Sequence, residues 1–464
     1  MKNIQITAII LALSVLLTAC AAGTMNTTQS PASESVYDEE DYATEYDESD
    51  VTNIDLAQGS VTISEAGTYM ISGTVQDGSV IVDASDNDEI RLILNGCSIT
   101  STTGAPIYVK NAGKVFITTE EGTDNYLSNT TGFEADGDTN VDGVIFCKND
   151  LTLNGTGTLH IESCDHGIVG KDELVITGGT YEIDSDADAL QANDLIAISS
   201  GSFTIVSGDD AIHSESDLII DGGTINIIEC EEGLEGNTVT VNGGDITLTA
   251  SDDGINAAGE NSTGMMAVPS SWIVINGGTI DITSYGDGID SNGDLTINGG
   301  YITVSGPENS GNGSLDYAGT GSITGGTVIA AGMSGMQMNF TEASQGSVLI
   351  STELLSAGTA VTVTDSSGNE ILSFTPSTSY SCVLISSPDL EQGRTYTITA
   401  GGSSFEVTLE NLIYGQTAGM GGFGMGPGGN PGEVPMGQEF DGQMPPEPPE
   451  GFDGQTPPEP PTGR

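Results

Sequence analysis

The sequence predicts an all-β protein whose main body is a right-handed parallel β-helix with about 22 residues per coil. Three observations support this prediction: glycines recur at a fixed spacing, each repeat holds short strands, and apolar residues show no helical period. Glycines close a strand-and-turn unit at Gly157, Gly179, Gly201, Gly223, Gly244, Gly278 and Gly300, with spacings of 22, 22, 22, 21, 34 and 22. The spacing of 34 equals one repeat plus a 12-residue insertion near Gly259–Ser271. A β-sandwich with repetitive turns would not keep this period.

Each repeat has the same internal order. An apolar strand precedes the glycine turn, as in Leu218–Gly223, and a second strand follows it, as in Thr279–Thr283. An acid-Gly/Ala-Ile/Leu step comes next, and we expect its Ile or Leu to stack inward from coil to coil. Glycine and asparagine at the corners supply the left-handed backbone conformations that sharp bends need.

The first residues indicate an exported lipoprotein. Lys2 and the apolar run Ile4–Leu17 lead into Leu17-Thr18-Ala19-Cys20, which follows the bacterial lipobox pattern. We therefore predict a signal peptide over residues 1–19, lipidation of Cys20, and attachment to the outer face of the cell membrane. The alternative is an ordinary signal peptide or a short transmembrane anchor, although the apolar run is short for a span.

Composition sets the remaining boundaries. Residues 20–52 are rich in Ser, Thr, Asp and Glu and predict an acidic disordered tether, and the solenoid is expected over residues 53–344. Residues 345–413 abandon the period and contain hairpin signals at Asp365–Asn369 and Gly401-Gly402, which predict a β cap on the open end of the solenoid. Residues 414–464 are rich in Gly, Met and Pro and predict a disordered tail.

The charge is strongly one-sided. Among 464 residues there are 67 acids and 8 Lys or Arg, so the formal net charge is −59. No Lys or Arg occurs between Lys171 and Arg394. Nucleic-acid binding is excluded in practice, because phosphates need basic side chains to displace their counterions. Such a chain should instead attract divalent cations.

The acids fall into columns when the coils are aligned on the acid-Gly/Ala-Ile/Leu step. Adjacent coils lie about 4.8 Å apart, and like charges at that distance repel by roughly 3–4 kcal/mol at an effective dielectric near 20. Calcium binds six to eight oxygens and would relieve this repulsion. The alternative is that each Asp caps its own turn and faces water. The predicted calcium ligands are Asp209, Asp210, Glu231, Glu232, Glu235, Asp252, Asp253, Asp287 and Asp290.

Catalysis finds little support. Elimination from a uronate needs a Lys or Arg base beside the calcium, and none lies between Lys171 and Arg394. Carboxylate pairs suited to glycoside hydrolysis are too common in this chain to be specific. His166 and His213 occupy repeat positions, and we interpret them as solvated turn residues. Trp272 and Tyr285 are weak candidates for stacking on sugar rings, with core packing as the alternative.

Several motifs together resemble the carbohydrate-binding, right-handed parallel β-helix lipoproteins of Gram-positive anaerobes. The motifs are Gly67–Gly73, Leu92–Gly96, Ile107–Lys110, Thr362–Asn369, Ser386–Leu390 and the repeated Asn-Gly-Gly and Asp-Gly-Ile steps. The resemblance covers nearly all of residues 54–413. It implies a fold related to pectate lyases, bound calcium, and binding of cellulose or acidic plant polysaccharides.

The related calcium-dependent lyases place ligands in an Asp-Asp-x-x-Asp pattern, with another Asp one coil earlier. Glu231, Glu232 and Glu235 match that pattern, and Asp209 or Asp210 supplies the earlier acid. The departure is Glu for Asp, which lengthens each ligand arm. The lyase base has no match here.

We therefore expect a non-catalytic, lipid-anchored, cell-surface protein that uses calcium to bind an acidic or cellulosic polysaccharide. One alternative is a calcium-dependent polysaccharide lyase or a glycoside hydrolase of the pectin-degrading type. The other is an adhesin or wall spacer without glycan specificity.

Overall fold

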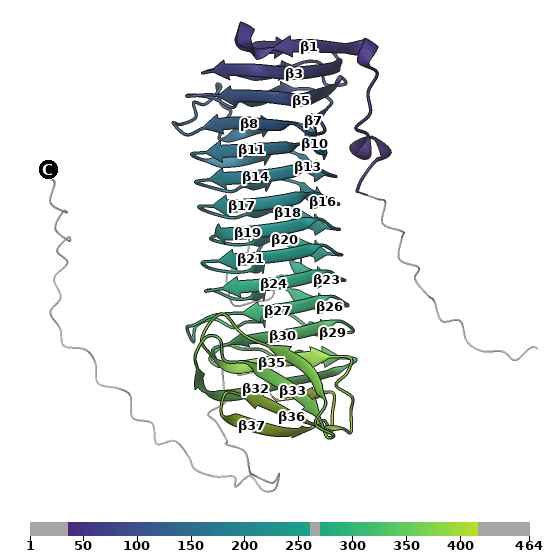
Figure 1. Cartoon of the computed structure of the whole chain (residues 1–464), viewed down its shortest axis with the longest axis vertical. Helices are drawn as coiled ribbons and strands as arrows, with labels where there is room; N and C mark the ends of the chain where they lie inside the picture. The colour runs from purple at the N-terminus through teal and green to yellow at the C-terminus, as the bar shows by residue number, and fades with distance from the viewer. Residues whose placement is uncertain (1–35, 260–269, 416–464) are drawn as a thin grey trace, which may run out of the picture. The chain divides into compact units, whose positions relative to one another are not determined.

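The computed structural model describes residues 36–259 and 270–415. The predicted signal peptide, Cys20, most of the insertion after Gly259 and nearly all of the predicted tail lie outside the described residues. In the described part of the chain, no helix is long and apolar enough to cross a membrane. The predicted parallel β-solenoid is confirmed: about 12 turns follow one another with a spacing of about 23 residues (Figure 1).

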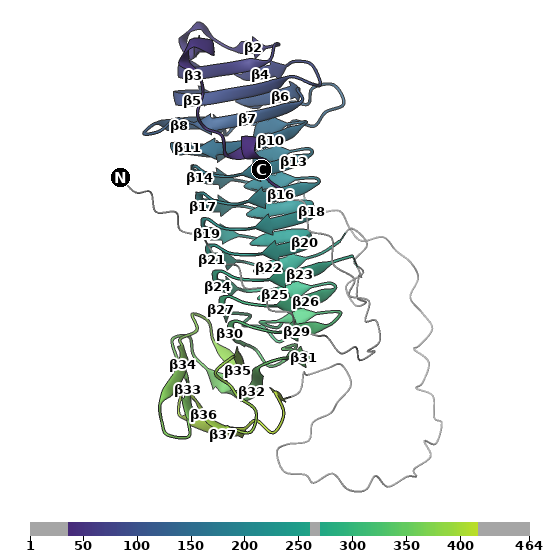
Figure 2. The same ribbon diagram turned by 90° about the vertical axis from the view of Figure 1, so that its right-hand side faces the viewer.

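Three ladders of parallel strands run along the solenoid, and the turns between its two ends contribute to all three (Figure 2). The first ladder holds β1 (Val51–Asp55), β3 (Gly67–Gln76), β5 (Glu89–Thr100), β7 (Lys114–Thr119), β10 (Asp150–Gly155), β13 (Glu173–Ile176), β16 (Leu195–Ile198), the end of β18 (Ile212–Ile220), the end of β20 (Leu234–Val241), β23 (Trp272–Ile275), β26 (Asp294–Ile297), β29 (Gly321–Ile323) and β31 (Glu342–Ala343).

The second ladder begins on the ends of β3 and β5 and continues after each glycine turn. It holds β8 (Asp124–Asn129), β11 (Thr158–Ser163), β14 (Thr180–Ser185), β17 (Ser202–Ser207), β19 (Thr224–Cys230), β21 (Asp245–Ala250), β24 (Thr279–Ser284), β27 (Tyr301–Ser305) and β30 (Thr327–Gly332).

The third ladder follows the acid-Gly/Ala-Ile/Leu steps. It holds β2 (Val61–Ile63), β4 (Val80–Asp83), β6 (Ile107–Asn111), β9 (Gly143–Cys147), β12 (His166–Gly170), β15 (Leu190–Ala192), the start of β18, the start of β20, β22 (Ile255–Ala257), β25 (Ile289–Ser291) and β28 (Asp316–Tyr317).

The core consists of aliphatic side chains stacked in register. Within the third ladder the Ile or Leu of each step points inward, as expected, and Leu190, Ile212 and Leu234 are completely buried. Each such side chain contributes about 1.5–3 kcal/mol by leaving water. Because side chains alternate along a strand, the next residue of each of these strands faces outward. This alternation creates the polar face described below.

Glycine is required at the corner between the first and second ladders. Gly223 has φ +96° and Gly300 has φ +89°, a region that other residues adopt only with strain. Because glycine recurs at this corner of each coil, the spacing of these glycines equals the number of residues per coil.

The C-terminal cap is also confirmed. Strand β35 (Tyr380–Ser387) pairs antiparallel with β30 and with β32 (Gly346–Leu355), so it covers the last edge of the second ladder, and β38 (Ile413–Tyr414) pairs with β32. A separate four-stranded sheet has the order β34 (Glu370–Phe374), β33 (Val361–Asp365), β36 (Thr395–Ala400) and β37 (Ser403–Thr408). Its apolar residues pack with those of β30, so the cap and the last coil share a core.

Residues 36–50 differ from the prediction of a disordered tether. They form two short 3-10 helices, η1 (Glu39–Tyr42) and η2 (Glu48–Asp50), with a third, η3 (Leu56–Gln58), after β1. The buried Asp41 carboxylate lies 2.7 Å from Lys114 Nζ and accepts a hydrogen bond of 2.6 Å from the Thr152 hydroxyl. The prediction extended too far because composition cannot reveal a partner on distant coils.

Candidate cation-binding site

The acid-Gly/Ala-Ile/Leu steps bring two kinds of polar side chain to one face of the solenoid. The first kind, an acid, lies at the corner just before a strand of the third ladder. Asp210, Glu232, Asp253 and Asp287 precede β18, β20, β22 and β25 in this way. The second kind lies on the strand itself, one residue after the buried Ile or Leu.

Each corner carboxylate holds the next coil through one of its two oxygens. Asp188 Oδ1 accepts the backbone N–H of Asp210 at 3.1 Å, and Asp210 Oδ1 accepts that of Glu232 at 3.2 Å. Asp253 Oδ1 accepts the N–H of Asp287 at 2.5 Å. These bonds account for one oxygen of each carboxylate and leave the other free to face its neighbours on the polar face.

The strand residues form a second column beside the corner acids. Gln191 is in register with His213, and His213 with Glu235. Farther along the solenoid, Glu235 pairs with Asn256, Asn256 with Asp290, and Asp290 with Asp316. A nitrogen or oxygen donor therefore stands beside the corner carboxylates on six successive coils.

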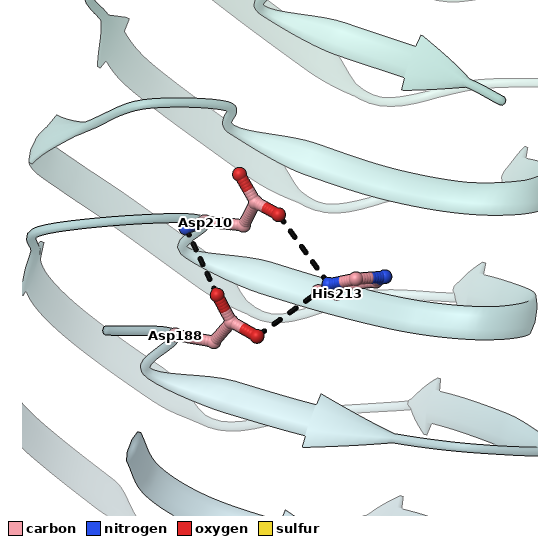
Figure 3. A group of neighbouring side chains, drawn as sticks. All are labelled: Asp188, Asp210 and His213. Atoms are coloured by element: carbon pink, nitrogen blue, oxygen red, sulfur yellow. Dashed lines mark hydrogen bonds and ion pairs between the residues drawn. The ribbon is translucent and has the colours of Figure 1, made fainter. Parts of the chain in front are cut away.

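Three groups of donors have ligand atoms that all lie within 4.8 Å of one another. The histidine group consists of Asp188, Asp210 and His213 (Figure 3). The glutamate group consists of Asp210, Glu232 and Glu235, and the aspartate group of Asp253, Asp287 and Asp290. Each group combines corner acids with one residue of the strand column, and each could hold a metal ion.

The structure separates the predicted ligands into two sets. Asp210, Glu232, Glu235, Asp253, Asp287 and Asp290 belong to the groups above. Asp209, Glu231 and Asp252, the first acids of the doublets, are exposed and lie outside these groups. The second acid of each doublet, and not the first, faces the carboxylates of the neighbouring coils.

Burial raises the pKa of most of these carboxyl groups. Burial and then the neighbouring carboxylates raise the pKa of Glu232 to about 8 and that of Asp290 to about 7. The same causes raise the pKa of Asp287 to about 8 and that of Asp253 to about 6, although each accepts a backbone hydrogen bond. Desolvation and repulsion are the conditions that a bound cation would relieve.

Asp188 behaves differently because it lies between two imidazoles. Burial opposes its ionisation, but contacts with His166 and His213 lower the pKa of Asp188 to about 2. The carboxyl oxygen Asp188 Oδ2 lies 3.4 Å from Nδ1 of each ring. Neither histidine is therefore a solvated turn residue. The side chains of His166 and His213 are 16% and 23% exposed, and both lie against carboxylates.

The sequence is similar to that of a known protein family. Residues 57–218 and 209–371 match the sequence model of a family described as carbohydrate-binding domain-containing protein. The chain belongs to this family. Membership supports carbohydrate binding as the general function of the solenoid, because the two matches together cover most of it.

A relative named carbohydrate-binding domain-containing protein, from Acetivibrio thermocellus, is 35% identical over 136 residues. The match covers 29% of this chain and 48% of the relative, so the chain spans about half the length of the relative it matches. A solved structure of a polysaccharide lyase-like protein from C. thermocellum, a gadolinium derivative, has a TM-score of 0.35 and 26% identity. That comparison covers 59% of this chain and 96% of the other.

Both aromatic side chains predicted as candidates for stacking on sugar rings are accessible to solvent. Trp272 is 39% exposed at the start of β23, and Tyr285 is 49% exposed directly after β24. Tyr285 is also two residues before Asp287, at the corner that carries the aspartate group. The alternative of core packing does not hold for either side chain.

Three members of the polar face were not predicted as ligands: Asp188, His213 and Asp316. Their signal was their repeat position, because each aligns with a predicted ligand one coil away. Residue type alone did not identify them as ligands, since a single His or Asp is not distinctive in an acidic chain.

Proposed function

We propose that this protein binds an acidic, uronate-containing polysaccharide outside the cell through calcium held on its polar face, without cleaving the polysaccharide. The observation that carries this proposal is the aspartate group, an oxygen-only donor set on the solenoid of a carbohydrate-binding family member. Calcium prefers carboxylate and amide oxygens. The aspartate group supplies the carboxylates, and the neighbouring Asn256 supplies an amide.

An unpaired buried oxygen supports the fit of calcium. Asn256 is in register with Asp290 and is 6% exposed, and its Nδ2 donates to Glu232 Oε2 at 2.8 Å. Its Oδ1 has no hydrogen-bond partner in the described part of the chain. Such an oxygen is costly when left unsatisfied, and a cation beside it would satisfy it. Asp253, Asp287, Asp290 and Asn256 are therefore the residues that would hold the ion, and the glutamate group offers a second oxygen-only set.

Charge explains why a cation is needed for an acidic glycan. The sequence has no Lys or Arg between Lys171 and Arg394, so the polar face has no basic side chain with which to attract a uronate. A bound dication supplies positive charge that protein and glycan carboxylates can share. Exposed Tyr285, at the same corner, is placed to stack on a sugar ring.

The same absence of basic residues argues against cleavage. Uronate elimination needs a base that can take a proton beside the cation, and the face between Lys171 and Arg394 has no Lys or Arg for this role. We also propose that lipidation of Cys20 after export holds the solenoid at the cell surface. We expect the wild type to incorporate a lipid label and the Cys20→Ala variant to lose it.

The test is calorimetric binding of polygalacturonate to the full chain, in calcium and in a chelator. We expect binding in calcium, loss of binding in chelator, and at least tenfold weaker binding for Asp290→Asn. Asp245→Asn is the matched control, because Asp245 is an exposed acid at the start of β21, away from the three groups.

Each part of the proposal has its own contrary result. Release of an unsaturated uronate product would contradict the non-catalytic role. Binding that is unchanged by chelator would contradict the calcium bridge. Failure to bind any glycan in calcium would favour a wall spacer.

A further inference from the structure

We propose that the histidine group is a site for a transition-metal dication of the Zn²⁺ class. This site is separate from the aspartate group, and the inference does not depend on the proposed function. Its three protein donors are Nδ1 of His213, Oδ2 of Asp188 and Oδ2 of Asp210. They come from two neighbouring coils, and Figure 3 shows the Asp188 and Asp210 carboxylates turned toward the same imidazole nitrogen.

The distances around His213 fit a shared central ion better than direct hydrogen bonds. Nδ1 lies 3.4 Å from Asp188 Oδ2, 3.4 Å from Asp210 Oδ2 and 3.6 Å from Glu235 Oε2. Charge-assisted N–H···O bonds are shorter, about 2.7–2.9 Å. A tetrahedron with metal–ligand bonds of about 2.1 Å has ligand–ligand edges of about 3.4 Å. The distances from Nδ1 to Asp188 and to Asp210 match that edge.

The nitrogen decides between classes of cation. Longer calcium bonds of about 2.4 Å could also produce such spacings, but calcium takes oxygen ligands. Neutral imidazole with carboxylates is a donor set suited to Zn²⁺ and similar metals. His213 is the nitrogen-heterocycle donor in a column whose other described members are Gln191, Glu235, Asn256, Asp290 and Asp316.

His213 Nδ1 has three carboxylate oxygens as close neighbours. These oxygens are acceptors, like an unprotonated nitrogen. A proton on Nδ1 points toward one carboxylate at a time, whereas an ion between His213, Asp188 and Asp210 would contact all three donors. His166 differs, because its Nδ1 accepts the backbone N–H of Asp188 at 3.2 Å, which occupies its lone pair.

Burial and charge support the same site. The side chain of Asp188 is 3% exposed and that of Asp210 is 10% exposed, so both carboxylates are largely removed from water. A bound dication would offset the negative charge that these carboxylates carry when ionised. Gln191, in register with His213, adds a buried amide oxygen without a hydrogen-bond partner in the described residues.

Asp210 belongs to both the histidine group and the glutamate group. An ion bound at His213 would therefore take Asp210 away from the glutamate group. This sharing separates the two metals by position: the transition metal occupies the coils of Asp188 and Asp210, and calcium occupies the coils of Asp253 and Asp287.

The test is titration of the full chain, freed of metal by chelator, with Co²⁺ as a spectroscopic substitute for Zn²⁺. We expect one equivalent to give the intense visible absorption of tetrahedral Co²⁺, and Zn²⁺ to displace it. His213→Ala and the isosteric Asp188→Asn should each weaken Zn²⁺ binding by more than the roughly 10–100-fold typical of outer-shell changes. Circular dichroism and thermal unfolding would establish that both variants fold.

His160→Ala is the matched control. His160 also lies beside acids, with Nδ1 3.0 Å from Glu182, but it stacks on Tyr126 outside the histidine group. Retained Co²⁺ absorption in folded His213→Ala, a weak octahedral spectrum, or no binding by the wild type would each overturn the proposal. Asp290→Asn should lose calcium-dependent glycan binding and keep Co²⁺ absorption, so the two proposals can fail separately.

Discussion

Replacing Asp290 by asparagine should make the calcium-free protein more stable at alkaline pH. Asp290 lies in the aspartate group, where burial and the charges of Asp253 and Asp316 raise its pKa to about 7. In the unfolded chain its pKa returns to near 3.8. A carboxyl group whose pKa is raised by folding stabilises the fold while it is protonated, and this stability is lost as the pH rises through about 7.

The magnitude follows from the two pKa values. At pH 8, moving the pKa of a carboxyl group from 3.8 to about 7 corresponds to at most about 4 kcal/mol of lost stability. Asparagine keeps the shape and removes the charge, so the variant should avoid most of this loss. It should also ease ionisation of Asp287, whose raised pKa is partly due to Asp290. For a folded body of this size, about 4 kcal/mol corresponds to a shift of roughly 5 °C in Tm.

The assay is thermal unfolding of wild type, Asp290→Asn and the control Asp245→Asn at pH 5 and pH 8, in chelator and in calcium. In chelator, the Tm of wild type and Asp245→Asn should fall between pH 5 and pH 8, and the fall should be smaller for Asp290→Asn. Calcium should raise the Tm of wild type at pH 8 and have less effect on Asp290→Asn.

The reasoning is refuted if wild type and Asp290→Asn have the same pH dependence in chelator. It is equally refuted if calcium stabilises both proteins by the same amount at pH 8.

Other predictions concern ligand choice, the N-terminal segment and the glycine corners. Glu232→Gln should lower calcium affinity in calorimetry, whereas Glu231→Gln, which changes an exposed acid outside the donor groups, should leave it unaltered. Asp41→Ala removes the buried partner of Lys114 and should lower the free energy of unfolding in urea by about 2–4 kcal/mol. It should also expose residues 36–50 to protease, and unchanged cleavage would contradict this packing. Gly300→Ala should cost about 1–3 kcal/mol, because φ is +89° and the new Cβ would lie 3.0 Å from two carbonyl oxygens. Gly402→Ala, with open space around it, is the control and should unfold like the wild type.

Much of the fold was readable in the sequence because its signals are local and repeat. The glycine spacing set the coil length, and the Ile or Leu of each acid-Gly/Ala-Ile/Leu step indicated the inward side. Leu190, Ile212 and Leu234 are completely buried, as that pattern predicts. Hairpin signals at Asp365–Asn369 and Gly401-Gly402 likewise predicted the β33–β34 and β36–β37 pairs of the cap.

The candidate site was readable only in part. The repeat aligned Asp210, Glu232 and Asp253, but it also selected their exposed neighbours Asp209, Glu231 and Asp252. The sequence does not say which acid of a doublet turns inward, because that depends on backbone bonds to the next coil. Asp188 and His213 were hidden for a related reason: their roles depend on side chains one coil away.

The sequence by itself therefore determined the period, the core and the excess of acid, since each is a property of single residues and their spacing. The tertiary structure alone decided which carboxylates meet, which oxygen of each is occupied by a backbone N–H, and that Asp41 packs on distant Lys114. These outcomes depend on contacts between residues on different coils. Strand register sets such contacts, and local composition does not determine which residues of neighbouring coils are paired.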